Sequence, residues 1–290
     1  MVRQVPTSAT TLFNNKFLQV NPNRTHLAFQ HDSSLHTLET KIKSIHAITD
    51  LAPENRLLFK DAQDTDHVLI TPETIFHPQG GGQPSDTGTI STSTVTFDVH
   101  SVRMDSVKDG QVLHYGRFTT PHAVFKEGES VTQNIDTEKR LLYSKYHTAG
   151  HVLGAAVRHL LQDSIAGFDE LKASHFPDSA ACEFQGSIDG KWKPEIQKKV
   201  DEYIAAAMPV EIEWWDEEDF KRERLERLIP QERMGGMEPD EKWRIVRIRG
   251  AECYPCGGTH VGTSEECGTT TVKKIARSKG NSRVSYTVAA

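Results

Sequence analysis

Two short segments, far apart in the chain, carry side chains that together could bind a metal ion. The first has the sequence HTAGH at residues 147–151, and the second has the sequence CGGTH at residues 256–260. On a helix, side chains four residues apart share a face, so both histidines of the first segment can bind one ion from consecutive turns. A cysteine thiolate combined with imidazoles is a ligand set that suits Zn²⁺. The sequence therefore predicts one zinc site, with the ligands His147, His151, Cys256 and His260.

The residues around these ligands distinguish between kinds of zinc site. A zinc peptidase usually has the motif HExxH, in which the glutamate is the general base, but Thr148 occupies that position here. Four protein ligands could close the coordination sphere of a structural zinc, and Cys253 could pair with Cys256 in a zinc knuckle. Gly150 and Gly154 instead favour a site that a substrate can reach, because they leave the ligand-bearing helix face uncrowded. We expect an exchangeable position at the metal, with the closed structural site as the alternative.

A glycine-rich run is the second informative feature. Residues 76–88 have the sequence FHPQGGGQPSDTG, with consecutive glycines at Gly80, Gly81 and Gly82. The run is not a phosphate loop of the NTPase kind, because no Gly-Lys-Ser/Thr follows it. Three glycines exceed what a hairpin turn requires, and backbone without side chains can approach a small ligand closely. We expect the run to extend towards the zinc site and line a substrate pocket; the alternative is that it only shapes the turn.

Composition is that of an ordinary globular protein. The 290 residues can form two domains, each with its own core, and 36% of them are hydrophobic and 26% charged. Four cysteines are too few for a disulfide scaffold of this size, and reduced thiols fit a metal site. No apolar run is long enough to span a membrane. We expect a cytoplasmic protein; the absence of Asp and Glu from residues 1–31 leaves a mitochondrial presequence as the alternative.

Positive charge is concentrated near the C-terminus of a chain whose net charge is −6. Residues 242–290 contain nine Lys and Arg but three Glu, so this part is basic while the remainder is acidic. A basic surface beside a catalytic loop would suit a polyanionic substrate, although it could also be an ordinary solvated strand face. The nine basic residues are Lys242, Arg244, Arg247, Arg249, Lys273, Lys274, Arg277, Lys279 and Arg283.

Hydrophobic patterning predicts an N-terminal β-barrel domain in residues 1–135. Short alternating runs separated by turn residues are typical of a small all-β domain. We expect strands at 12–20, 38–45, 67–70 and 95–99.

The pattern changes at Asp136, which is suited to cap the N-terminus of a helix. Residues 136–290 mix helical and strand patterns, which predicts an α+β domain on a largely antiparallel sheet. Residues 230–240 are expected to form a polar loop. We expect helices at 136–162, 194–208 and 217–228, and strands at 174–176, 180–184, 210–215, 243–248, 270–276 and 283–288.

Taken together, these motifs resemble those of the AlaX family of alanyl-tRNA editing proteins. This family is similar to the editing domain of alanyl-tRNA synthetases and to the second additional domain of threonyl-tRNA synthetases. The resemblance rests on GGGQP, HTAGH and CGGTH in this order, and on the final segment ECGTTTVKKIARSKGNSRVSYTV. It implies a free-standing editor with an N-terminal β-barrel and a C-terminal editing domain, since no segment resembling a class II synthetase core precedes the motifs.

The resemblance also implies roles for individual residues. It makes His147, His151, Cys256 and His260 the zinc ligands, and we expect Cys256 and His260 at the catalytic centre. Ser174 corresponds to a Ser- or Thr-bearing strand, and we expect it to be catalytic. Glu183 stands where related sequences commonly have Asp. The expected pocket residues are Gly80, Gly81, Gly82, Ser174 and Glu183, and the expected tRNA-binding residues are Lys273, Lys274, Arg277, Lys279 and Arg283.

Pocket energetics explain why such an editor is needed. A pocket for alanine cannot exclude glycine and rejects serine weakly, because one methylene discriminates by only about 1–3 kcal/mol. We therefore expect a zinc-dependent hydrolase that deacylates Ser-tRNA(Ala) and Gly-tRNA(Ala) and spares Ala-tRNA(Ala). Two alternatives stay open: an editor of another aminoacyl-tRNA, such as a mischarged tRNA(Thr), and a non-catalytic, zinc-stabilised module that binds tRNA or a synthetase.

Overall fold

The computed structural model describes residues 21, 23–120, 123–231 and 237–289. The strand expected at 12–20 lies outside the described residues, as does most of the presequence-like segment and residues 232–236 of the expected polar loop. In the part that is described, no helix has the length and apolar character needed to cross a membrane.

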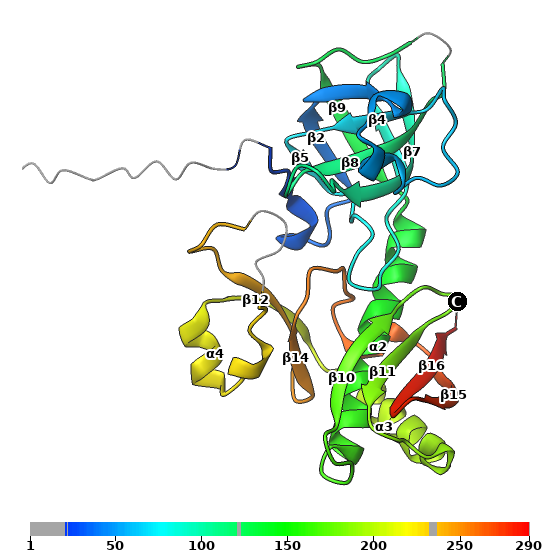
Figure 1. Ribbon diagram of the computed structural model, residues 1–290, viewed down its shortest axis with the longest axis vertical. Helices are drawn as coiled ribbons and strands as arrows, with labels where there is room; N and C mark the ends of the chain where they lie inside the picture. The colour runs from blue at the N-terminus through cyan, green and yellow to red at the C-terminus, as the bar shows by residue number, and fades with distance from the viewer. Residues whose placement is uncertain (1–20, 22, 121–122, 232–236, 290) are drawn as a thin grey trace, which may run out of the picture.

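The N-terminal half of the structure is a curled antiparallel sheet that forms a partly closed barrel (Figure 1). Its strands are β1 (His26–Leu27), β2 (Thr37–Lys41), β3 (Ser44–Ala47), β4 (His67–Ile70), β5 (Glu73–Thr74), β6 (Gly88–Ser91), β7 (Thr96–Met104), β8 (Val112–Phe118) and β9 (Ser130–Ile135). Seven of them follow the order β2-β9-β6-β7-β8-β4-β3, and β1 and β5 form a separate parallel pair. Short helices are η1 (Ala28–Gln30), η2 (Ile48–Asp50) and α1 (Pro53–Arg56).

The chain between β2 and β3 draws the two edges of this sheet together. The amide of Ile42 donates to the carbonyl of Glu129 beside β9, and the next amide, of Lys43, donates to the carbonyl of Ile70 on β4. The uninterrupted strand expected at 38–45 is therefore wrong, because the chain passes from one edge to the other at these two residues. The strand expected at 67–70 is confirmed, and the one expected at 95–99 continues to Met104.

The C-terminal half is an α+β unit. Its helices are α2 (Thr137–Leu161), η3 (Gly190–Trp192), α3 (Lys193–Ala205), α4 (Glu217–Glu223), η4 (Glu226–Leu228) and η5 (Ser264–Cys267). Its strands are β10 (Asp169–Ser174), β11 (Ala181–Gln185), β12 (Val210–Trp215), β13 (Trp243–Ile248), β14 (Glu252–Pro255), β15 (Thr270–Ser278) and β16 (Asn281–Val288). The expected α+β class with antiparallel strands is confirmed.

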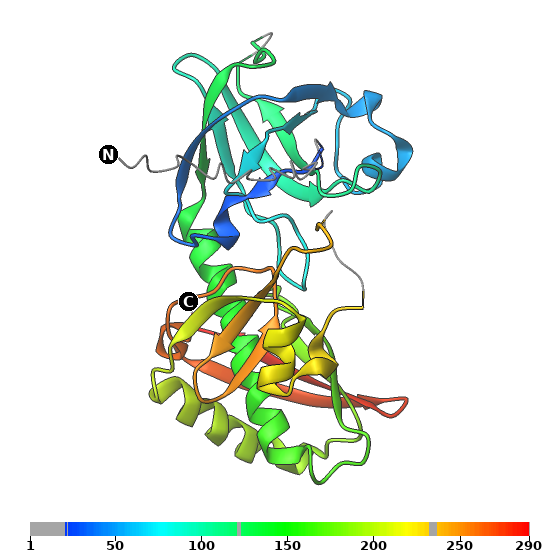
Figure 2. The same cartoon turned by 90° about the vertical axis from the view of Figure 1, so that its left-hand side faces the viewer.

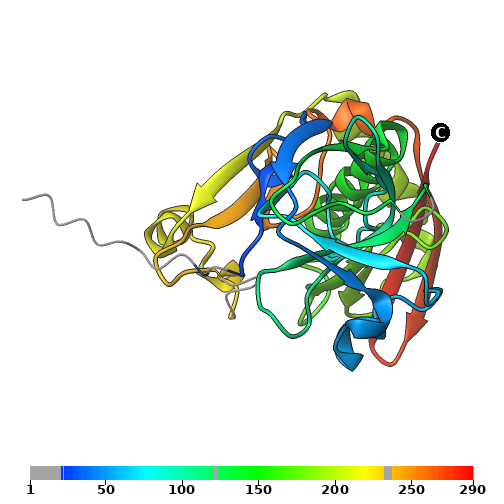
Figure 3. The same cartoon turned by 90° about the horizontal axis from the view of Figure 1, so that it is seen from above.

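These strands form two sheets where one was expected. One has the order β10-β11-β16-β15 and the other β12-β13-β14, and every pair in both is antiparallel. The strands predicted at 210–215 and 243–248 are confirmed, whereas β14 was not predicted. The helix expected at 217–228 breaks at Arg224, which has a left-handed backbone with φ of 60°. Figures 1 and 3 show the two sheets on opposite sides of the molecule.

Helix α2 connects the two halves, and Figure 2 shows it running from the barrel into the C-terminal unit. Asp136 caps it as predicted, because its side chain accepts the backbone N–H of Lys139. One turn further on, the buried Arg140 donates from Nε to both carboxylate oxygens of the buried Asp86, at 3.1 and 3.0 Å. The cores of the barrel lie within residues 28–135 and the remaining cores within 146–288. We propose that residues 1–135 and 136–290 are two domains, joined at the start of α2.

Candidate metal centre

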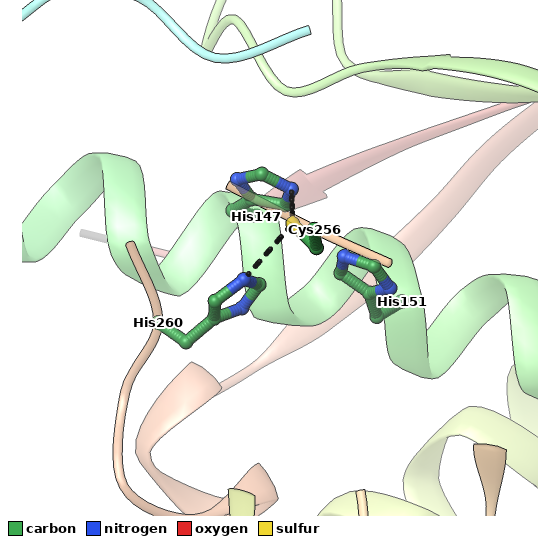
Figure 4. Close-up of side chains that lie close together, drawn as sticks. All are labelled: His147, His151, Cys256 and His260. Atoms are coloured by element: carbon green, nitrogen blue, oxygen red, sulfur yellow. Dashed lines mark hydrogen bonds between the residues drawn. The ribbon is translucent and has the colours of Figure 1, made fainter. Parts of the chain in front are cut away.

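The structure brings the four predicted metal ligands together. His147 and His151 project from one face of α2, while Cys256 and His260 come from the loop after β14 (Figure 4). One ligand atom from each lies within 4.8 Å of the others, and Cys256 Sγ is 3.4 Å from Nε2 of both His147 and His260. Zinc bonds of about 2.0–2.3 Å in tetrahedral geometry would separate neighbouring N and S ligand atoms by about 3.5 Å. The group can therefore hold a metal ion.

The protonation chemistry of the group also fits a metal ion. Nε2 of His151 is buried and has no hydrogen-bond partner among the described residues. Burial lowers the pKa of His151 to about 4, and burial and neighbouring imidazoles lower the pKa of His147 and of His260 well below the usual range. Uncharged imidazoles offer free lone pairs at neutral pH. Burial raises the pKa of the Cys256 thiol, and a bound cation would offset this by stabilising the thiolate.

Gln83, which directly follows the three glycines, orients His147. Its side-chain oxygen lies 2.6 Å from Nδ1 of His147 and accepts the backbone N–H of Thr259 at 3.0 Å. Its amide nitrogen donates to the Thr259 hydroxyl at 2.8 Å. Because the glutamine oxygen is an acceptor, Nδ1 of His147 carries the proton, which leaves Nε2 free towards Cys256. One side chain thus connects the glycine run with both ligand motifs.

Two threonine hydroxyls, one inside each ligand motif, form hydrogen bonds that position His260 and the loop that carries it. The Thr148 hydroxyl lies 3.2 Å from Nδ1 of His260 and accepts the backbone N–H of Val261 at 3.2 Å. The Thr259 hydroxyl is 2.7 Å from the hydroxyl of Ser144 on α2. Metal-binding histidines typically have their second ring nitrogen held in this way, which sets the orientation and tautomer of the ring.

A glycine is required where the second motif passes His147. A Cβ on Gly258 would lie 2.2 Å from Cε1 and 2.3 Å from Nδ1 of His147, and 2.8 Å from the side-chain oxygen of Gln83. A Cβ on the neighbouring Gly257 would meet only the side-chain nitrogen of Gln30, at 3.0 Å. The two glycines of CGGTH therefore have different reasons to be glycine.

His175 occupies the space that Gly150 leaves on α2. A Cβ at Gly150 would lie 2.3 Å from Cε1 of His175. The buried His175 ring stacks on His147 with the centroids 4.1 Å apart, and its Nδ1 is 2.8 Å from the hydroxyl of Tyr286. The expectation that Gly150 keeps the helix face open to a substrate is wrong, because an imidazole fills that space.

A half-buried acid–tyrosine pair continues along α2 beyond His151. The Tyr254 ring lies 4.6 Å from that of His151, and its hydroxyl donates to Glu170 at 3.1 Å. Glu170 lies over Gly154, where a Cβ would be 2.7 Å from a carboxyl oxygen, so this glycine also makes room for a side chain. Burial raises the pKa of Glu170 to about 7, although the positive charge of Arg158 acts to lower it. The edge strands β10 and β14 therefore meet beside the metal group.

The glycine run reaches this centre. The carbonyl of Gly82 accepts the backbone N–H of His175 at 2.8 Å, and a Cβ on Gly82 would lie 2.3 Å from the carbonyl oxygen of Ala173. Gly81 and Gly82 have positive φ angles of 55° and 77°, and Gly80 pairs with Gln83 across the turn. A Cβ on Gly81 would meet nothing within 4 Å. The run therefore turns tightly and also packs beside the ligands.

Two of the expected pocket residues are not joined to the metal group. The Ser174 hydroxyl has no hydrogen bond within the described part of the chain, and it is the next residue, His175, that stacks on a ligand. Glu183 pairs with Arg283 at 2.8 Å and with Lys172 at 3.5 Å. Its strand neighbours Cys182 and Phe184 pack in the core with α2, so alternation along β11 turns Glu183 to the opposite face.

Eight of the nine basic C-terminal residues divide into two sets, and the ninth, Arg283, lies on β16. Those between 242 and 249 are engaged within the protein, for example Arg247 with Glu213 at 2.7 Å and Arg249 with Glu211 at 2.7 Å. Those on β15 and its turn are exposed, and a register shift between Val272 and Lys274 leaves two consecutive lysines in solvent. Among described residues, no salt bridge involves Lys273, Lys274 or Lys279, whereas Arg277 pairs with Asp189 at 3.6 Å and Arg283 with Glu183.

Cys253 and Cys267 lie away from the metal group, whereas Cys182 donates to the carbonyl of Gly150 at 3.3 Å. All four cysteines are free in the structure. Cys253 packs with Trp215 and Phe220, and Cys267 lies in the core around α2. The knuckle pair considered for Cys253 and Cys256 is therefore wrong, because strand alternation directs Cys253 to the α4 side of the sheet.

Several residues of the centre were not predicted individually. Gln83 lies inside the motif GGGQP, so the motif contained its signal, but nothing in the sequence indicates which atoms it contacts. His175, Tyr254 and Glu170 come from strands with no motif of their own. Only the tertiary structure places them beside the ligands.

The sequence is similar to that of known proteins that carry the names of tRNA synthetases and of a tRNA editing protein. The family described as tRNA synthetases class II (A) matches residues 3–139. The chain is 29% identical over 249 residues to an alanine–tRNA ligase of Haloquadratum walsbyi, covering 80% of this chain and 25% of the ligase. It is 31% identical over 221 residues to the alanyl-tRNA editing protein AlaX-L of Pyrococcus horikoshii, covering 76% of this chain and 50% of that protein.

The chain is thus an α+β protein whose sequence is similar to that of class II aminoacyl-tRNA synthetases. Within that class, the chain is a relative of the AlaX-type alanyl-tRNA editing proteins, and the resemblance predicted from its motifs is confirmed. The chain spans about a quarter of the length of the alanine–tRNA ligases and half that of AlaX-L.

Proposed function

We propose that the protein is a zinc-dependent hydrolase that removes wrong amino acids from tRNA(Ala), deacylating Ser-tRNA(Ala) and Gly-tRNA(Ala). The observation that carries this proposal is the four-ligand group, in which Gln83 connects the three motifs through direct contacts. A thiol and three imidazoles suit zinc better than the harder divalent cations. The names of the relatives, an alanyl-tRNA editing protein and alanine–tRNA ligases, support tRNA(Ala) as the RNA.

Zinc held by this group would act as a Lewis acid towards an ester carbonyl. The protein supplies the orientation. Gln83 fixes the tautomer of His147, and Thr148 holds the second nitrogen of His260. His175 closes one side of the ligand set by stacking on His147. Removal of such outer contacts typically lowers metal affinity or activity by about 10–100-fold.

We propose that the glycine run forms one wall of the aminoacyl pocket. Gly82 and Gln83 both contact residues of the metal centre, and Gly81 has open space at its Cβ position. Ser174 and Glu183 are not included in this wall, because strand pairing puts both on the face of the sheet that is turned away from α2.

Deacylation assays test the proposal. Purified protein is incubated with tRNA(Ala) charged with serine, glycine or alanine, with and without a chelator. We expect hydrolysis of the first two esters, no hydrolysis of the third, and loss of activity after zinc removal. Cys256→Ala is expected to abolish hydrolysis, because it removes a ligand.

The matched control is Cys253→Ala, three residues earlier in the same segment and outside the ligand group. This variant should retain zinc and activity. If Cys256→Ala hydrolyses the esters at the wild-type rate, the metal has no catalytic role. If metal is retained but no aminoacyl-tRNA is hydrolysed, the closed, structural zinc site of a binding module is the better description.

A further inference from the structure

Three stacked rings lie on the surface between the barrel and the sheet of β12–β14. His26 and His31 have parallel rings with centroids 5.0 Å apart and an interplanar angle of 21°. His31 and Trp214 continue the stack at 4.6 Å and 11°. Both histidines are exposed in the described structure, and Trp214 is half-buried. We refer to His26, His31 and Trp214 as the ring stack.

Trp214 of the ring stack lies across the sheet from the metal ligand Cys256. Trp214 on β12 is directly opposite Arg244 on β13, and the backbone N–H of Cys256 donates to the carbonyl of Arg244. Two strand spacings therefore separate the backbone of Trp214 from that of Cys256, which is about 10 Å. Because directly paired residues share a face of the sheet, Trp214 lies on the same face as Arg244, whose strand is next to Cys256.

The N-terminal segment brings the other two rings to this face. Arg244 donates to the carbonyl of Gln30 at 3.0 Å, and the side-chain amide of Gln30 donates to the carbonyl of Gly257 at 3.1 Å. Gln30 immediately precedes His31, so the stack is fixed beside the second ligand motif. Figure 1 shows the blue segment of η1 beneath the barrel, above the sheet of β12–β14.

The guanidinium of Arg244 places a positive charge beside Cys256. It is buried and donates to two carbonyl oxygens, those of Gln30 and Cys256. In the part of the chain that the structure describes, no carboxylate forms a salt bridge with it. An arginine remains charged at neutral pH, so the field at this edge of the centre favours an anionic chain.

We propose that the ring stack is a platform for the unpaired 3′ end of the substrate tRNA, whose bases extend the stack while the terminal ribose reaches the metal centre. The inference rests on the proposed function, because an aminoacyl ester on the 3′-terminal nucleotide must enter here. Single-stranded nucleotides are commonly bound by stacking on aromatic, histidine and arginine side chains. Stacked nucleotides advance about 3.4 Å each, so about three of them span the 10 Å to Cys256.

The test compares binding of two uncharged RNAs: tRNA(Ala) and the same tRNA lacking its three 3′-terminal nucleotides. We expect Trp214→Ala and His26→Ala, which remove the rings at the two ends of the stack, each to weaken binding of the complete tRNA about tenfold, in line with the loss of one stacked base. Binding of the shortened tRNA should be the same for wild type and both variants. Trp214→Phe, which retains a flat ring, should restore most of the affinity for the complete tRNA.

Ile212→Ala is the matched control, since Ile212 is an exposed aliphatic residue two positions earlier on the same strand face. It should alter neither RNA's affinity, and thermal melting and zinc content should be unchanged in all the variants. Equal losses of affinity for both RNAs, or no loss of affinity for either, would refute the proposal that the ring stack binds the 3′ end. Because binding uses uncharged tRNA, a protein that shows the 3′-end effect without hydrolysis would refute the proposed function and leave the platform intact.

Discussion

Substitution of the two glycines in CGGTH provides a sharp test of the metal centre. The Cβ of Gly258→Ala would lie 2.2 Å from Cε1 of His147. Non-bonded carbon atoms approach to about 3.5 Å, so the ring would have to move by roughly 1.3 Å. Metal–ligand distances tolerate only about ±0.2 Å. The same Cβ would also press on Gln83, which holds the tautomer of His147.

We expect Gly258→Ala to weaken zinc binding by at least about 100-fold, or about 2.8 kcal/mol, since it displaces a ligand and the group that orients it. Gly257→Ala is the matched control, because its Cβ meets only the terminal amide nitrogen of the Gln30 side chain, at 3.0 Å, and no ligand. That change should stay within about 0.5 kcal/mol, or roughly twofold.

Zinc affinity is measured by competition with a chromogenic chelator, together with thermal melting in the presence and absence of zinc. Zinc should raise the melting temperature of wild type and Gly257→Ala but much less that of Gly258→Ala, because stabilisation depends on affinity for the folded state. Equal zinc affinity for the two alanine variants would refute the steric reasoning.

Three further predictions concern other parts of the molecule. Asp136→Ala should lower the free energy of unfolding by about 1 kcal/mol through loss of the α2 cap, and Asp136→Asn, which keeps an acceptor, should cost clearly less. Burial disfavours ionisation of Asp66, but hydrogen bonds led by that from Arg117 outweigh it and lower the pKa. Asp66→Asn should therefore lower the free energy of unfolding by about 2 kcal/mol near neutral pH. This difference between variant and wild type should disappear as the pH falls below about 3.9 and through the lowered pKa of Asp66 in the folded state. A difference that stays constant across that pH range would contradict the reasoning. Lys273→Glu with Lys274→Glu should weaken tRNA binding without loss of zinc and reduce the slope of log affinity against log salt by about one for each lysine; unchanged binding at low salt would make β15 an ordinary solvated strand.

Local signals made much of the fold predictable. Asp136 marks the start of α2 because a side-chain cap depends on only a few neighbouring residues. The strands at 210–215 and 243–248 have the bounds expected from alternation. The failures arose where a distant contact decides the chain path. Residues 38–45 alternate without interruption, yet the chain changes sheet edge at Ile42 because of bonds to Glu129, which precedes β9, and to Ile70 on β4.

The sequence by itself determined which four side chains could form a metal group, because i,i+4 spacing on a helix and a short glycine-containing loop are local geometry. Only the tertiary structure decided what surrounds them. Gln83 reaches His147 from the barrel, and His175 fills the space above Gly150, because separate elements pack against one helix. Such contacts depend on how whole sheets and helices dock, and no periodicity or motif spacing within one segment specifies that docking.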